Sequence, residues 1–96
     1  MSLFVVKHRH TPESCPAKDR ISGTFLLSHL SQATASQFGV KIRATAVLDG
    51  QHILELIVDA SDEILVERFM APFAKLGNVD IIPANTCETV VLRAQC

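Results

Sequence analysis

The amino-acid sequence predicts one α+β domain whose elements follow the order strand, helix, strand, strand, helix, strand. The chain has 96 residues, the size of a single small domain, so we expect one domain over 1–96. Apolar residues form short runs or alternate with polar ones in four segments, and they recur at helical spacing in two longer segments. Between two of the strand-like segments stands Asp49-Gly50, a dipeptide typical of tight hairpin turns.

The first strand is expected over residues 3–10. It opens on consecutive apolar residues from Leu3 to Val6, and such a run is typical of a strand that is covered on both faces. Residues 11–16 contain two prolines, which lack the backbone N–H that a ladder requires, so we expect a loop there.

Residues 18–38 are expected to form one helix. Asp19 or Ser22 is suited to cap its start, and Gly39 stands where a helix commonly ends. His29 lies off the apolar stripe and is expected to be partly exposed. The stripe itself consists of Leu26, Leu27, Leu30, Ala33, Thr34 and Phe38.

A hairpin is expected over residues 40–48 and 51–59. In the first arm, one face would carry Val40, Ile42, Ala44, Ala46 and Leu48, and the other Lys41, Arg43 and Thr45. In the second arm, Leu54, Leu56 and Val58 alternate with Glu55, Ile57 and Asp59. Alternation with a period of two predicts strands that are buried on one face only.

A second helix is expected to begin at the cap residue Ser61 and to end at Gly77. A short strand at 79–82 follows, and Pro83 limits it or places it at a sheet edge. Residues 86–93 are compatible with either a helical turn or a strand. The apolar stripe of the second helix consists of Leu65, Phe69, Pro72, Phe73 and Leu76.

Composition excludes several classes of function. Nine basic and ten acidic residues give a net charge of −1, so we expect no nucleic-acid partner. No apolar run approaches the roughly 20 residues of a membrane span, so we expect no membrane association and a cytosolic location. Trp and Tyr are absent, which leaves only Phe to line an aromatic pocket.

The order of elements is that of a ferredoxin-like fold, and over nearly the whole chain it resembles the dimeric α+β barrel superfamily. This resemblance rests on element order and not on a motif. It implies a homodimer in which the open sheet faces pack together. Members of the superfamily include cofactor-free monooxygenases, small isomerases, haem-degrading enzymes and small metal-binding proteins, so the fold alone does not select a function. The lack of Trp and Tyr disfavours the monooxygenase and haem-degrading classes.

Histidine and cysteine residues suggest a metal site at one end of the sheet. His8 and His10 stand two residues apart, and on a strand such side chains share a face at a spacing of about 6.5–7 Å. In the expected sheet order, 4-1-3-2, His52 lies beside the end of the first strand, with Cys15 in the adjoining loop. Imidazole and thiolate ligands suit zinc, nickel or copper. We expect Cys87 to lie apart from this cluster.

Three alternatives to the metal site stay open. Histidines at a strand end are often simply solvated, and the protein is then a structural or partner-binding dimer. In the second alternative, Cys15 is a reactive thiol, activated by a helix N-terminus with Lys18 and Arg20 and served by His8 or His10 as base.

The third alternative is a cofactor-free enzyme that acts on a small molecule. His10 or His52 would be the general base, and Arg9 or Arg43 would hold an anionic substrate. Such an enzyme requires a pocket between the sheet and the helices that reaches one of these histidines.

Overall fold

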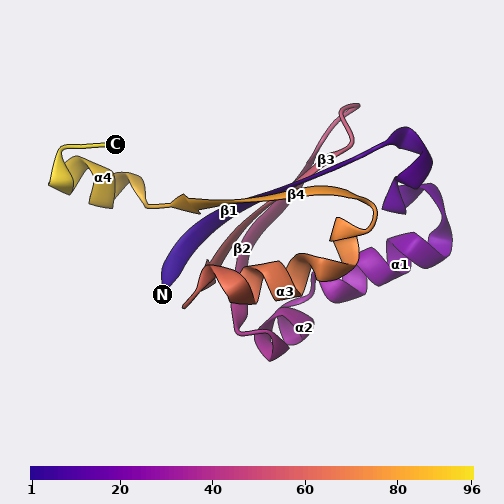
Figure 1. Ribbon diagram of the computed structural model, residues 1–96, viewed down its shortest axis with the longest axis horizontal. Helices are drawn as coiled ribbons and strands as arrows, with labels where there is room; N and C mark the ends of the chain where they lie inside the picture. The colour runs from indigo at the N-terminus through magenta and orange to yellow at the C-terminus, as the bar shows by residue number, and fades with distance from the viewer.

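A four-stranded antiparallel sheet forms the centre of the computed structural model, which describes residues 1–96, and three helices cover one of its faces (Figure 1). The hydrogen-bonded strand order is β2-β3-β1-β4, an arrangement that fits a ferredoxin-like fold. The elements are β1 (Ser2–His10), two 3-10 turns η1 (Pro12–Ser14) and η2 (Pro16–Lys18), α1 (Arg20–His29), α2 (Gln32–Gln37), β2 (Val40–Leu48), β3 (Ile53–Ala60), α3 (Glu63–Ala74), β4 (Gly77–Ala84) and α4 (Cys87–Arg93).

The hydrophobic core lies between the sheet and helix α3. Strand β1 contributes Phe4 and Val6, and α3 contributes Phe69 and Phe73, which are almost completely buried. Burying one such side chain stabilises the fold by about 1.5–3 kcal/mol. The remaining core residues are Ala35, Val40, Ile42, Leu56, Val58, Ala60, Val66 and Met70. The alternation expected for residues 51–59 is confirmed, because Leu54, Leu56 and Val58 are buried on the helix side.

The prediction of a single helix over 18–38 is wrong. The helix is interrupted at Leu30 and Ser31, which separate α1 from α2. Ser31 has an extended backbone, and its side chain accepts a hydrogen bond from the N–H of Thr34, so it begins a new helix. Asp19 caps α1 by accepting from the N–H of Ser22. Leu27, which the helical spacing places on the apolar stripe, is 76% exposed.

His29 is buried, so the expectation that it is partly exposed is wrong. Its Nε2 donates to the carbonyl oxygen of Phe69 at 2.6 Å, and its ring stacks on the Phe69 ring with centroids 4.7 Å apart. The hydrogen bond satisfies the polar atom, and the aromatic contacts make the ring part of the packing. His29 therefore has a structural role.

A β-bulge in β2 changes which side chains face the helices. The pairing with β3 steps from Ile42↔Val58 directly to Ala44↔Ile57, so Arg43 is the extra residue. Beyond the bulge, Ala44, Ala46 and Leu48 lie on the open face, contrary to the expected alternation, and Thr45 and Val47 lie opposite Leu56 and Leu54 on the helix side. One inserted residue is enough for this reversal, because strand side chains alternate with a period of two.

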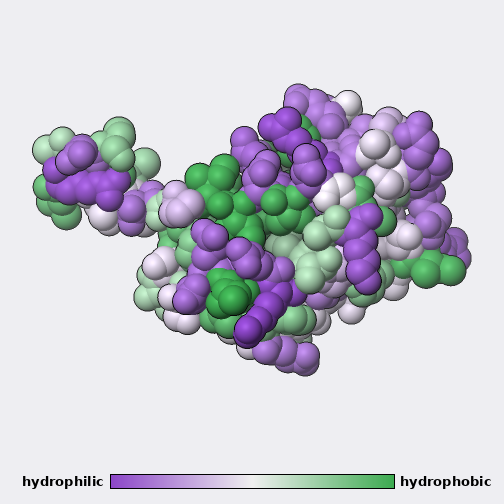
Figure 2. Space-filling model, viewed as in Figure 1, coloured by the Kyte–Doolittle hydropathy of each residue, from purple (hydrophilic) through white to green (hydrophobic).

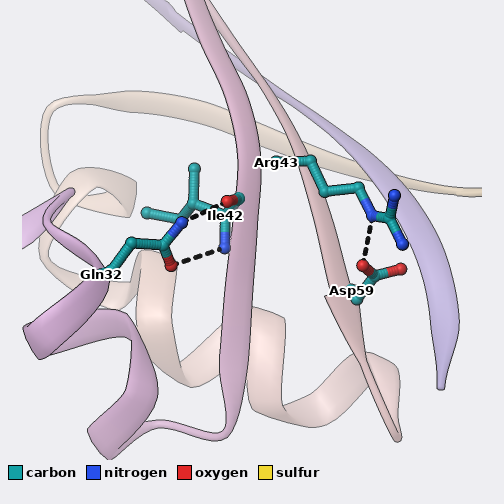
Figure 3. Close-up of polar contacts among 4 residues, drawn as sticks. All are labelled: Gln32, Ile42, Arg43 and Asp59. Carbon is teal, nitrogen blue, oxygen red and sulfur yellow. Dashed lines mark hydrogen bonds and ion pairs between the residues drawn. The ribbon is translucent and has the colours of Figure 1, made fainter.

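Figure 3 shows two polar contacts at the bulge, one between Gln32 and Ile42 and one between Arg43 and Asp59. The Gln32 side chain pairs with both backbone groups of Ile42, accepting from its N–H at 3.2 Å and donating to its carbonyl oxygen. Strand β2 is an edge strand, so this amide satisfies groups that would otherwise be open to pairing with another chain. On the open face, Arg43 forms an ion pair with the buried carboxylate of Asp59.

The turns near the site also differ from the expected ones. The hairpin at Asp49-Gly50 is present, but its loop continues to His52, and Gly50 and His52 have φ angles of 74° and 54°. A positive φ is uncommon for a histidine, so His52 is held in an unusual backbone conformation. Asp62, and not Ser61, caps α3. Gly77 does not end α3 as expected, because it is the first residue of β4 and lies opposite His10.

The C-terminal segment forms helix α4 beyond the edge strand β4. Thr86 caps α4 by accepting from the N–H of Thr89, which resolves residues 86–93 as a helix. In Figure 2 this helix is a separate lobe joined to the rest by a thin neck. Its Cys87 is exposed and takes no part in the histidine cluster. None of the helices combines the length and the apolar character needed to cross a lipid bilayer.

Candidate metal centre

Three of the four predicted ligands meet at one end of the sheet: His10, Cys15 and His52. Their ligand atoms all lie within 4.8 Å of one another, and all three residues are partly buried. The antiparallel pairing of β1 with β3 explains the meeting of the two histidines. The N–H of His10 donates to the carbonyl oxygen of His52 at 3.2 Å, and the two ring centroids are 5.3 Å apart.

The loop that carries Cys15 is fixed at both ends. Before it, Thr11 and Ser14 form a reciprocal capping box around η1. The hydroxyl of Ser14 also donates to the carbonyl oxygen of Leu76 at 3.0 Å, which ties the loop to the connection between α3 and β4. After Cys15, the buried Pro16 restricts the backbone at the start of η2. The thiol is therefore held beside the strand ends by residues close to it in the sequence.

The surroundings of His10 favour the neutral form of its imidazole. Burial lowers its pKa below the usual value, and the neighbouring rings of His8 and His52 lower that pKa further. Both of its ring nitrogens are buried without a hydrogen-bond partner. A neutral imidazole nitrogen is the form that binds a metal, and buried polar atoms without partners are rare in folded proteins.

His8, the fourth predicted ligand, does not join the cluster and lies deeper in the fold. Its side chain is completely buried, and Nε2 donates to the carbonyl oxygen of Phe73 at 2.8 Å. Burial lowers the pKa of His8, although the hydrogen bond to Phe73 acts in the opposite direction. Its Nδ1 has no partner, and its ring centroid is 5.3 Å from that of His10.

A pocket of about 190 Å³ adjoins the three ligands on the helix side of the sheet. Its apolar walls include Leu26, Val47 and Leu54. Val47 reaches this wall only because of the β-bulge, a feature that the alternating sequence did not reveal. The other lining residues are His8, His10, Cys15, Pro16, Ala17, Leu48, Asp49, Gly50 and His52.

The arrangement is close to what a tetrahedral metal ion needs. Bond lengths of about 2.0–2.3 Å place neighbouring ligand atoms roughly 3.3–3.6 Å apart, so the widest pair would have to close by about 1 Å. Side-chain rotation can supply such a movement. Three protein ligands leave a fourth position, as in catalytic zinc sites.

The alternative roles receive less support from the geometry. Helix α1 begins at Arg20, and Asp19 already accepts from its first turn, so Cys15 does not lie at the N-terminus of that helix. Arg9 and Arg43 do not line the pocket, so neither is placed to hold an anionic substrate there. A pocket that reaches His10 and His52 does exist, as the enzyme alternative requires.

Comparison with protein-family models gives no match for this chain, and comparisons with curated proteins and with solved structures give none either.

Proposed function

We propose that this protein binds a transition-metal ion through His10, Cys15 and His52, with the fourth coordination position directed to the adjoining pocket. The observation that carries the proposal is the convergence of three ligand atoms within 4.8 Å from three separate segments of the chain. Two imidazoles and one thiolate favour zinc, with nickel and copper as the other candidates.

The chemistry of the cluster supports this assignment in two further ways. The lowered pKa of His10 reduces competition from protons near neutral pH, and its unpartnered ring nitrogens leave a lone pair available. Cys15 is a free thiol, so its sulfur is available to bind a metal ion as the thiolate.

Metal titration of the reduced, metal-free protein tests the proposal. We expect one equivalent of Zn²⁺ to bind, and one equivalent of Co²⁺ to give a thiolate charge-transfer band together with visible absorption of tetrahedral intensity. The variants Cys15→Ser, His10→Ala and His52→Ala should each weaken zinc binding by at least about tenfold, since even changes in the shell outside the ligands commonly cost 10–100-fold.

The matched control is Cys87→Ser, which removes an exposed thiol from α4. It should leave zinc affinity and the cobalt spectrum unchanged. Wild-type binding no tighter than the high micromolar range, or equal loss in Cys15→Ser and Cys87→Ser, would rule the site out.

We also propose that two copies of the chain pair through the open sheet face. On that face, Val5 lies between Ile57 of β3 and Ile82 of β4, and both isoleucines are about 40% exposed. Beside them Lys7 and Glu55 lie 4.0 Å apart, so the face carries charges of both signs, which a twofold-related copy could meet with charges of opposite sign.

Sedimentation of wild type and two variants tests this dimer. Ile57→Asp should give a monomer, because it buries a charge at the centre of the interface. Ile64→Asp, which changes an exposed isoleucine on α3, should remain a dimer. A monomeric wild type at tens of micromolar would contradict the proposal.

A further inference from the structure

The pair His8 and His10 contains buried polar atoms that nothing in the surrounding protein satisfies. Nδ1 of His8 and both ring nitrogens of His10 lack hydrogen-bond partners, and His8 is completely buried. Buried polar atoms without partners have lost their hydrogen bonds to water with no compensation, so a hydrogen bond or a metal ion at such atoms would stabilise the protein. Three of them lie on adjacent rings of one strand face.

The hydrogen bond to Phe73 determines the tautomer of His8. A carbonyl oxygen only accepts, so Nε2 of His8 must carry the proton that it shares with Phe73 at 2.8 Å. In a neutral imidazole with Nε2 protonated, Nδ1 presents a lone pair. The backbone of α3 therefore makes Nδ1 of His8 a hydrogen-bond acceptor.

The neighbouring His10 is at the right distance to supply the donor. The two ring centroids are 5.3 Å apart, and the ring planes are inclined by 32°. An N–H···N hydrogen bond of about 2.9–3.0 Å between two ring edges places the centroids roughly 5 Å apart. A modest rotation of either ring is sufficient to form that bond.

We propose that His8 is a positioning residue of the metal site, which accepts a hydrogen bond from one ring nitrogen of His10 and leaves the other nitrogen of His10 as the metal ligand. The resulting chain runs from the Phe73 carbonyl through His8 and His10 to the ion. Ligating histidines generally donate their second ring N–H in this way, which fixes the tautomer and strengthens the ligand. The inference rests on the proposed function and goes beyond it in the role given to His8.

Two matched glutamine variants test this role. In His8→Gln the side-chain amide can still donate to the Phe73 carbonyl, but the acceptor at the position of Nδ1 is lost. His29→Gln is the control, because His29 is also buried and also donates through Nε2 to a carbonyl of α3, that of Phe69. His29 does not contribute to the metal cluster.

Zinc affinity, measured by competition with a chromophoric chelator, should fall by about 10–100-fold in His8→Gln. In His29→Gln it should stay within threefold of wild type, and the cobalt spectrum should change only in His8→Gln. Unchanged affinity in a folded His8→Gln, or equal losses in both variants, overturns the role. Circular dichroism identifies a variant that has failed to fold.

A measurement on the wild type keeps the inference testable if His8→Gln does not fold. Long-range ¹H–¹⁵N correlation spectra report the protonation of each ring nitrogen. In metal-free protein at pH 7.5 we expect His8 with Nε2 protonated and Nδ1 free. Protonation at Nδ1 overturns the inference while leaving the metal site intact. If the wild type binds no zinc, the proposed function and this role both fail.

Discussion

Replacement of Gly77 by alanine should destabilise the protein strongly, because a backbone atom occupies the space that the new methyl group needs. A Cβ on Gly77 would lie 1.9 Å from the carbonyl oxygen of Arg9 and 2.8 Å from its carbon, whereas ordinary contacts begin at 3.4 Å. Strand β4 would have to retreat from β1 by about 1.5 Å, and β1 cannot yield, since β3 holds its other edge. Overpacking of about 1–3 kcal/mol, together with one or two weakened ladder hydrogen bonds, gives a loss of about 2–5 kcal/mol.

The same substitution at Gly23 provides the control. There the nearest atom to a new Cβ is the Pro16 carbonyl oxygen at 3.6 Å, and the residue lies inside helix α1. Gly23→Ala should therefore stabilise the protein by about 0.5–1 kcal/mol through better helix propensity. The same glycine-to-alanine substitution is thus expected to destabilise the protein at Gly77 and to stabilise it at Gly23.

Urea unfolding of the metal-free protein measures both effects. With a slope of about 2 kcal/mol per molar urea, the expected loss of about 2–5 kcal/mol in Gly77→Ala should lower the midpoint by about 1–2.5 M, and Gly23→Ala should raise it slightly. Because Gly77 pairs with His10, zinc binding should weaken in Gly77→Ala alone. A Gly77→Ala variant within about 0.5 kcal/mol of wild type would refute the reasoning, whatever Gly23→Ala does.

Two further predictions concern the edge strand β2 and the stability of the protein at low pH. Gln32→Ala removes both hydrogen bonds to Ile42, so it should lower the free energy of unfolding by about 1–2 kcal/mol and promote aggregation through the uncovered edge. The control Gln37→Ala, also on α2, should stay within about 0.5 kcal/mol of wild type. Equal urea midpoints for the two variants would contradict this. Burial lowers the pKa of His8 and of His10 below 6.5, so the unfolded chain takes up protons first as the pH falls. The free energy of unfolding of metal-free protein should then decrease below pH 6.5, by up to about 1.4 kcal/mol per pH unit for each histidine, and less steeply in His8→Gln. A flat profile between pH 7 and 5.5 would argue against neutral, buried imidazoles.

Much of the fold follows from local patterns in the sequence. The apolar run of β1, the hairpin at Asp49-Gly50 and the glycine after α2 all lie where the sequence placed them, because each depends on a few neighbouring residues. The errors have two different causes. The helix break at Ser31 is local, because the Ser31 side chain accepts from the N–H of Thr34 and begins a new helix within a continuous helical spacing. The bulge at Arg43 depends on the pairing of β2 with β3, which the alternating pattern does not specify.

For the candidate site, the sequence by itself was sufficient to predict a cluster of His8, His10, Cys15 and His52 at one end of the sheet, and three of these four residues, His10, Cys15 and His52, do meet there. Residue spacing and strand order are sufficient for that grouping, since antiparallel pairing brings the end of one strand to the start of the next. Only the tertiary structure decided the separate position of His8 and the burial of His29. Each donates to a carbonyl of α3, a partner 65 residues away for His8 and 40 for His29. Such long-range hydrogen bonds depend on how a helix packs against the sheet, and no local pattern in the sequence specifies that packing.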